Sequence, residues 1–243
     1  MKAQKVNAEH IKKEKKAKNK RNLGLLIFLQ FIFIFGMLAA TLIMLALSPM
    51  FEVYDIEVGG NKHYSEEDII SASGLIPGTN GFKLVGGSIE DILNLRDSDA
   101  ENAIKKELSY IKDVVVKFTF TDRIIITVKE REPFAVVPFY GSSILVDDEA
   151  WVLETLEGGN SKPLPLIKGL KFDSFELGQV LELKDTDSFF YAVNLINEII
   201  KSDSKSDFKL FPRIDYFDVN DINNICFLYD SRIVVNLGRL EKL

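Results

Sequence analysis

Cysteine and histidine are nearly absent from this sequence. Its 243 residues include one cysteine, Cys226, so no disulfide can form within a single copy of the chain. The two histidines, His10 and His63, lie on opposite sides of a long apolar run, so they cannot meet in one metal site. The sequence therefore predicts no metal centre, no cofactor, and globular parts held by their hydrophobic cores alone.

Catalytic signatures are missing too, since no G-x-S-x-G, P-loop or GxGxxG pattern occurs. The S-x-x-K motif of penicillin-binding enzymes lacks the S-D-N and K-T-G elements that complete such a site. It occurs at Ser109 with Lys112, Ser202 with Lys205 and Ser206 with Lys209. The carboxylates Asp147, Asp148 and Glu149 lack the spacing of a calcium loop, and we interpret them as a solvated turn between strands. We therefore predict that the chain is not an enzyme and has no small-molecule substrate.

Charge is distributed unevenly along the chain. Residues 1–22 carry nine Lys or Arg against two Glu, a net charge of about +7, which leaves 21 basic and 34 acidic residues in 23–243. Residues 23–47 contain no charged residue at all. As a helix this run spans about 37 Å, enough to cross a hydrocarbon core of about 30 Å. Neither the short basic tail nor the acidic remainder is typical of a nucleic-acid-binding protein.

The basic tail predicts the orientation of the membrane helix. By the positive-inside rule, residues 1–22 are cytoplasmic and everything after residue 47 is extracytoplasmic. A cleaved signal peptide is the alternative, because Ala46-Leu47-Ser48 has a small-x-small pattern. It is disfavoured by the length of the apolar run and by Pro49 directly after Ser48. Gly36 and Ala40 form a small-xxx-small pair that would let a second helix approach closely.

Strand and helix patterns after residue 50 predict two domains of class α+β. Residues 51–130 show a strand, a helix with a capping box from Ser65 to Asp68, a second helix with a box at Ser98 and Glu101, and a hairpin. In the hairpin, core positions alternate with polar ones; they are Val114, Val116, Phe118, Ile124, Ile126 and Val128. This order predicts three strands covered by two helices. Residues 81–97 are interpreted as an inserted loop with a short helix at residues 88–95.

Residues 131–243 are richer in strands. We expect strands at residues 134–140, 144–146 and 151–153, with Trp151 in the core, and a helix at residues 186–201. A closing hairpin is expected from residues 225–229 and 232–237.

Short stretches along residues 51–238 resemble, in order and spacing, the FtsQ/DivIB cell-division proteins and their POTRA domain. They are F-x-V-x-x-I-x-V-x-G-N from Phe51, G-x-N-x-F from Gly78, E-R-x-P-x-A from Glu130, L-V-D from Leu145 and L-G-x-x-L from Leu177. Ala150 stands where the family usually has glycine. The resemblance implies a non-enzymatic scaffold at the division septum. It would bind FtsL-like and DivIC/FtsB-like bitopic proteins and regulate septal peptidoglycan synthesis.

The resemblance also implies a partner-binding strand near the C-terminus. In the family a further helix and strand follow the strand that resembles residues 233–237, and the final strand receives the FtsB-type partner. Here the sequence stops at Leu243. Either the domain is truncated and its last strand is an exposed edge prone to self-association, or partners dock elsewhere. We take as candidate partner-binding residues Ile233, Val234, Val235, Asn236 and Leu237.

Two other function classes remain as alternatives. A membrane-anchored envelope enzyme or ligand-binding sensor would use the β-rich domain as its site. An outer-membrane transport protein is disfavoured, because no barrel-like series of strands follows the single POTRA pattern.

Overall fold

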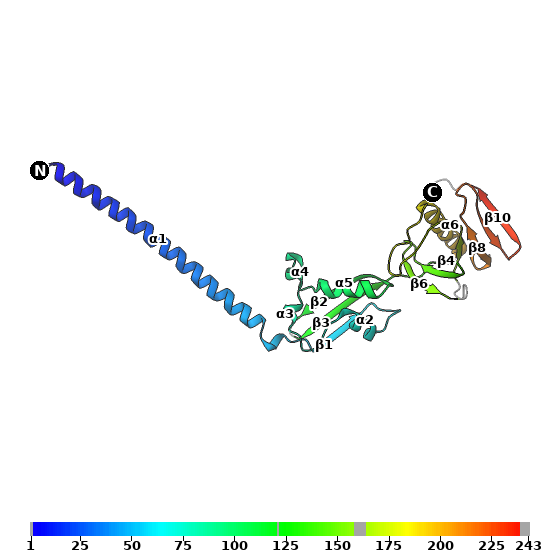
Figure 1. The fold of residues 1–243 in the computed structure, drawn as a ribbon, viewed down its shortest axis with the longest axis horizontal. Helices are drawn as coiled ribbons and strands as arrows, with labels where there is room; N and C mark the ends of the chain where they lie inside the picture. The colour runs from blue at the N-terminus through cyan, green and yellow to red at the C-terminus, as the bar shows by residue number, and fades with distance from the viewer. Residues whose placement is uncertain (1, 121, 158–163, 239–243) are drawn as a thin grey trace.

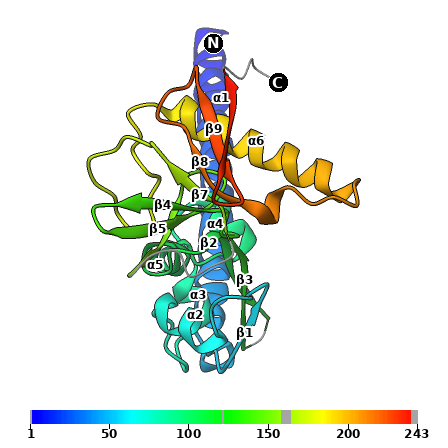
Figure 2. The same ribbon diagram turned by 90° about the vertical axis from the view of Figure 1, so that its right-hand side faces the viewer.

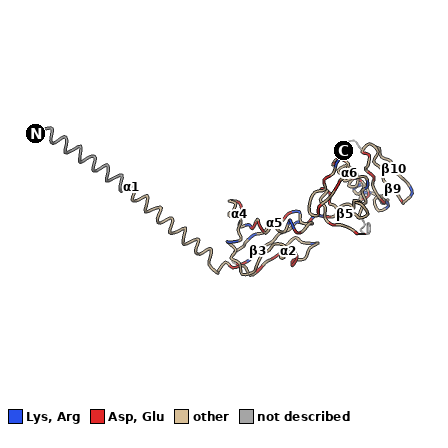
Figure 3. The backbone as a smooth tube through the Cα atoms, in the orientation of Figure 1, with Lys and Arg blue, Asp and Glu red and all other residues tan. Residues whose placement is uncertain are grey.

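A computed structural model of the chain describes residues 2–120, 122–157 and 164–238, and of residues 2–23 only the backbone. One long helix, α1 (Lys2–Ala46), leads into two sheets (Figure 1). Within α1, Gly24–Ala46 is long and apolar enough to cross a membrane, and almost all of its side chains are exposed. Figure 3 shows no charged residue along this stretch. Exposed Leu, Ile and Phe side chains on an isolated helix are expected where lipid is the solvent.

The first sheet has three strands in the order β1-β3-β2. Strand β1 (Asp55–Gly59) runs parallel to β3 (Arg123–Glu130), and β2 (Ile111–Thr119) pairs antiparallel with β3. Helices α2 (Glu66–Ser73) and α5 (Ser98–Glu107) cover one face. The alternation predicted for the hairpin is confirmed, because all six expected core side chains are buried.

One helix start differs from its sequence pattern. The capping box of α2 at Ser65 and Asp68 is present, but α5 is capped by Asp97, whose side chain accepts from Ala100 N at 3.0 Å. The predicted box of Ser98 and Glu101 is therefore wrong. Glu101 instead accepts from Arg96 and from Val116 N, so a tertiary contact has taken the side chain that a local cap would have used.

The segment between α2 and α5 contains two short helices, α3 (Gly81–Leu84) and α4 (Ile89–Asn94). The second matches the short helix expected at residues 88–95. A turn of 3-10 helix, η1 (Pro49–Phe51), links α1 to this region. Asn80 ties them together, because its side-chain amide donates to Ala46 O at 3.0 Å and to Ser48 O at 2.9 Å.

The second sheet has seven strands in the order β10-β9-β8-β7-β4-β5-β6. Strands β4 (Ala135–Phe139), β5 (Ser142–Val146) and β6 (Val152–Leu156) form an antiparallel meander. Strands β7 (Leu166–Lys168) and β8 (Ile214–Asp218) are parallel neighbours joined through α6 (Thr186–Ser204) and a 3-10 turn, η2 (Phe211–Arg213). The last described elements are the predicted hairpin of β9 (Ile225–Tyr229) and β10 (Ile233–Gly238).

The main core of this sheet lies on the face covered by α6 (Figure 2), where Phe189 and Ile196 of the helix meet Phe217 and Ile225 of the strands, all fully buried. On the opposite face, Val136, Leu145 and Leu153 pack against Tyr110, the residue directly before β2. The two sheets therefore share a small apolar cluster in addition to their separate cores. The architecture is α+β, as the sequence predicted.

Candidate functional site

The five candidate partner-binding residues lie together on β10, which forms one edge of the seven-stranded sheet. Its inner side pairs with β9, with Val235 opposite Phe227, and within the described residues no strand pairs with its outer side. Ile233 is 50% exposed and Val234 60%, whereas Val235 packs against the core beneath α6. An edge with unpaired backbone groups and half-exposed apolar side chains can accept a strand from another chain.

The face of the sheet turned away from α6 adds to this edge. Cross-strand pairing places Val234 opposite Leu228, Leu228 opposite Tyr216, and Tyr216 opposite Leu166. Leu166 is in turn opposite Val136, which is fully buried under the cluster of Tyr110. The row thus passes from buried positions next to the three-stranded sheet to an exposed end at β10.

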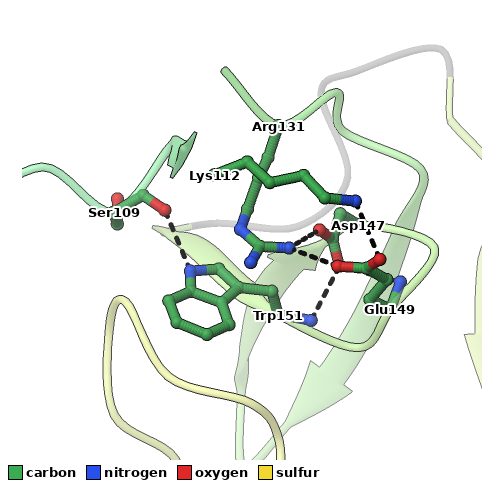
Figure 4. Close-up of polar contacts among 6 residues, drawn as sticks. All are labelled: Ser109, Lys112, Arg131, Asp147, Glu149 and Trp151. Atoms are coloured by element: carbon green, nitrogen blue, oxygen red, sulfur yellow. Dashed lines mark hydrogen bonds and ion pairs between the residues drawn. The ribbon is translucent and has the colours of Figure 1, made fainter. Parts of the chain in front are cut away.

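A second arrangement of polar side chains joins the two sheets (Figure 4). Arg131 directly follows β3, and its side chain is only 8% exposed. Its Nη1 donates to Asp147 Oδ2 at 2.5 Å and to Glu149 Oε2 at 2.8 Å, both in the turn between β5 and β6. Asp147 Oδ1 accepts from Glu149 N at 2.9 Å and Trp151 N at 2.8 Å. We call the set Ser109, Lys112, Arg131, Asp147, Glu149 and Trp151 the joint.

Tryptophan and serine complete the joint. The Arg131 guanidinium carbon lies 4.0 Å from the centre of the Trp151 ring, within the range of a cation–π contact. Trp151 Nε1 donates to Ser109 O at 2.9 Å, and Ser109 Oγ donates to Leu153 O at 2.6 Å. Each contact connects the end of the three-stranded sheet with β6 or the turn before it.

Three ionisable groups of the joint region have shifted pKa values. Hydrogen bonds from Lys112 and then Arg131 hold the pKa of Glu149 below its ordinary value. The same hydrogen bond to Glu149, at 2.7 Å, raises the pKa of Lys112. Burial, followed by the hydrogen bond to Glu154, raises the pKa of Tyr110. All three shifts favour the protonation states that hold the two sheets together at neutral pH.

Glu130 orders the loop after β1 next to the joint. Its carboxylate accepts backbone N–H bonds from Lys62 at 2.8 Å, His63 at 2.6 Å and Tyr64 at 3.1 Å. The His63 ring then stacks on Tyr110, with ring centres 3.7 Å apart.

The side chains of the joint hold the two sheets in a fixed orientation, but they are not arranged for nucleophilic chemistry. The hydroxyl of Ser109 donates to a backbone carbonyl, and Lys112 is paired with Glu149. The two side chains of this S-x-x-K motif are therefore not bonded to each other as a nucleophile and its base would be. Lys209 Nζ donates to the backbone of Asp203 and Ser206. Among the described residues, no group of three or more His, Cys, Asp or Glu is placed to hold a metal ion.

The joint was not found by sequence reasoning. The prediction that Asp147 belongs to a solvated turn is wrong, because this carboxylate is 2% exposed and ion-paired with Arg131. Glu149 and Asp148 of the same turn are exposed, as expected. Trp151, expected in the core, is partly buried and packs against the small apolar cluster of Tyr110, not against the main core beneath α6. The available signal was the pair of short stretches E-R-x-P and L-V-D, which contain Arg131 and Asp147.

Ala150, at the position where glycine is usual in the family, has a positive φ of 62°. This is the left-handed region, which glycine adopts without steric cost and alanine does not. The turn keeps its shape here because Asp147 accepts two N–H bonds across it.

Comparison with known proteins gives one family. Residues 51–131, which include the three-stranded sheet and Arg131, match the family model of the POTRA domain, FtsQ-type. The cell division protein DivIB of Clostridium botulinum strain Hall is 24% identical over 237 residues, which cover 97% of this chain and 82% of that protein. DivIB of Clostridium tetani is 24% identical over 195 residues, 80% of this chain and 66% of that protein.

Cell division protein FtsQ of Syntrophotalea carbinolica is 28% identical over 144 residues, 59% of this chain and 46% of that protein. Similarity to DivIB thus extends over nearly the whole chain, from the apolar helix through both sheets. Residues 51–131 are thus a POTRA domain of the FtsQ type, and the chain as a whole is a relative of the cell division proteins DivIB and FtsQ, with one helix long and apolar enough to cross a membrane.

Proposed function

We propose that the chain is a non-enzymatic scaffold of the division machinery that binds FtsL-like and DivIC/FtsB-like bitopic proteins at the septum. Through them it regulates septal peptidoglycan synthesis. In this proposal residues 1–22 are a cytoplasmic tail and residues 23–47 the membrane helix. The POTRA domain of residues 51–130 and the β-rich domain of residues 131–243 lie outside. No cofactor, small-molecule substrate or nucleic acid takes part.

The observation that carries the proposal is the outer edge of β10. Backbone hydrogen bonds from an added strand would give affinity, and pockets for its alternate side chains would give specificity. Ile233 and Val234 supply exposed apolar contacts, and the row through Leu228 and Tyr216 extends them across the sheet. A bitopic partner has the right chemistry, because an extended segment beyond its membrane helix can pair as a strand.

A photo-crosslinking amino acid in the full-length protein tests the proposal in dividing cells. It is placed at Val234 on β10 and, as the matched control, at Thr155, an exposed residue of β6 on the other edge of the same sheet. We expect adducts with two small bitopic proteins from Val234 and not from Thr155. Equal adducts from both positions, or none from Val234, would contradict the assignment of β10. Turnover of peptidoglycan fragments by the purified protein would favour the enzyme alternative instead.

Proline variants separate backbone pairing from side-chain contact. Successive residues of an antiparallel strand point their N–H groups to opposite sides, so one of Val234→Pro and Val235→Pro removes an outward donor and the other an inward one. We expect the variant that loses the outward donor to melt almost as the parent does and to lose partner capture. Capture that survives in both variants would show that the partner does not pair with this edge.

A further inference from the structure

Helix α4 carries its apolar side chains on the face turned away from the protein. Ile89, Ile92 and Leu93 occur at i, i+3 and i+4, so they share one side of the helix, and they are 79%, 56% and 78% exposed. On the opposite side of the helix Asp91 points inward, where its Oδ2 accepts from Ser98 Oγ at 3.2 Å, while Glu90 and Asn94 are exposed. A surface helix of a soluble domain normally shows the reverse arrangement.

The base of α4 is held firmly against the three-stranded sheet. Gly86 N donates to Arg96 O at 2.8 Å, which joins the two ends of the segment that carries α4, and Phe118 N donates to Leu95 O at 2.9 Å. Arg96 is clamped by two hydrogen bonds to the buried carboxylate of Glu101, at 2.9 and 2.6 Å. The outward direction of the apolar face is therefore a fixed feature of the fold.

The membrane helix is fixed to the same domain. The Asn80 side chain is only 6% exposed, binds the carbonyls of Ala46 and Ser48, and caps α3 through Phe82 N at 3.0 Å. Phe51, just after α1, packs edge-on against Phe82, with ring centres 5.1 Å apart. These contacts set the position of α4 relative to the bilayer that α1 crosses.

Figure 1 shows α4 projecting from the three-stranded sheet back toward the side from which α1 arrives, beside the level of α1's last turns. The remaining strands and helices extend in the other direction (Figure 1). More exposed apolar side chains lie where α1 ends, since Met50 is 60% and Phe120 63% exposed. An apolar helix face at this level meets the boundary of headgroups and acyl chains.

We propose that α4 is an interfacial membrane contact, with Ile89, Ile92 and Leu93 inserted in the outer boundary of the bilayer next to α1. The occupant of this face is lipid, because α1 already places a bilayer there and α4 presents to it a face without charge. The contact gives the domain a second point of attachment to the membrane and fixes its rotation about the axis of α1. It is independent of which partner binds β10.

Depth-sensitive fluorescence on the full-length protein tests the contact. In a Cys226→Ser background, an environment-sensitive probe is attached at Leu93→Cys or, as controls, at Glu90→Cys on the same helix and Tyr140→Cys in the distant β4–β5 turn. Glu90 is exposed and Tyr140 is 92% exposed. The proteins are reconstituted in phosphatidylcholine–phosphatidylglycerol vesicles that contain a lipid spin-labelled near its headgroup. Iodide serves as the quencher in water.

We expect the probe at Leu93 to be quenched by the spin-labelled lipid, to lose iodide quenching and to shift its emission to the blue. Probes at Tyr140 and Glu90 should keep stronger iodide quenching. Iodide quenching at Leu93 equal to that at Tyr140 would overturn the proposal. So would shielding at Leu93 that grows with the ratio of protein to lipid, since that result assigns the face to a second copy. Each labelled protein is first checked for unchanged melting.

Discussion

Replacing Asp147 by alanine should weaken the joint strongly, and the structure gives the expected size. The carboxylate accepts three hydrogen bonds, from Arg131 Nη1, Glu149 N and Trp151 N. Removing one partner of a buried ion pair costs about 3–5 kcal/mol, because the other charge stays buried without compensation. Arg131 would keep its contact with the half-exposed Glu149. We therefore expect the lower end of that range, about 3 kcal/mol.

The chain supplies its own probe for this measurement. Trp151 is the only tryptophan, and its ring lies against the Arg131 guanidinium, so its fluorescence reports on the joint. Urea unfolding of the full-length protein in detergent should show the Trp151 transition about 1.5 M lower for Asp147→Ala, given an m-value of about 2 kcal/mol/M. Far-UV circular dichroism on the same samples separates opening of the joint from global unfolding.

The neighbouring residue is the matched control. Asp148→Ala removes the same group from an exposed position of the same turn and should change stability by less than about 0.5 kcal/mol. In the double variant with Arg131→Met, the loss should be smaller than the sum of the single losses, because no unpaired buried charge remains. If Asp147→Ala unfolds at the same urea concentration as Asp148→Ala, the ion pair does not hold the sheets together and the reasoning fails.

Four further outcomes can be tested, three from the structure and one from the basic N-terminal tail. Ile126→Ala, at a fully buried position of β3, should cost about 2–4 kcal/mol in thermal or urea unfolding, and unchanged melting would show that the facing of the hairpin is wrong. Asn80→Ala should cost about 1–2 kcal/mol through the lost cap of α3 and should raise proteolysis at the end of α1, with Asn80→Asp as the variant that keeps the cap but not the amide donor. The pKa of Glu149 is lower in the folded state than its ordinary 4.5, so its contribution to folding stability is present above pH 4.5 and is lost as the pH falls through the lowered value. Glu149→Gln should therefore flatten the acid dependence of Trp151 fluorescence, and a profile identical to that of the parent would argue against this role. A reporter active only outside the cytoplasm should work at the C-terminus and fail at the N-terminus, and the reverse result would overturn the predicted orientation.

The parts of the fold that follow a local period could be read from the sequence. In β2 and β3, side chains alternate between core and solvent, so Val116 and Ile126 were placed correctly by position alone. Helix α6 and the β9–β10 hairpin were also predicted from periodic patterns of apolar residues, the helical period in α6 and alternation in the hairpin. In each case the residues that decide the structure are neighbours along the chain.

The features that the sequence did not predict depend on residues far apart in the chain. Strand β7 has three residues, too few for a period, and exists because it lies between β4 and β8 in parallel pairing across the α6 crossover. Asp147 looked solvated because its neighbours are acidic, yet its partner Arg131 lies 16 residues earlier and comes from the other sheet. A composition-based interpretation of a turn cannot include a buried partner that only the tertiary fold brings close.

Two buried polar contacts together fix the arrangement of α1 and the two sheets. Asn80 fixes the end of α1 to the three-stranded sheet, and Arg131 with Asp147 fixes that sheet to the seven-stranded one. Because Asn80 and Asp147 are buried, these contacts are shielded from water and salt and hold their geometry better than surface pairs would. With α1 in a membrane as proposed, the edge strand β10 would therefore stand at a set height above it. If β10 receives a bitopic partner as proposed, a partner whose pairing segment lies at a different distance from its own membrane helix could not reach this edge without straining its linker. The proposed scaffold would then select partners by reach as well as by sequence.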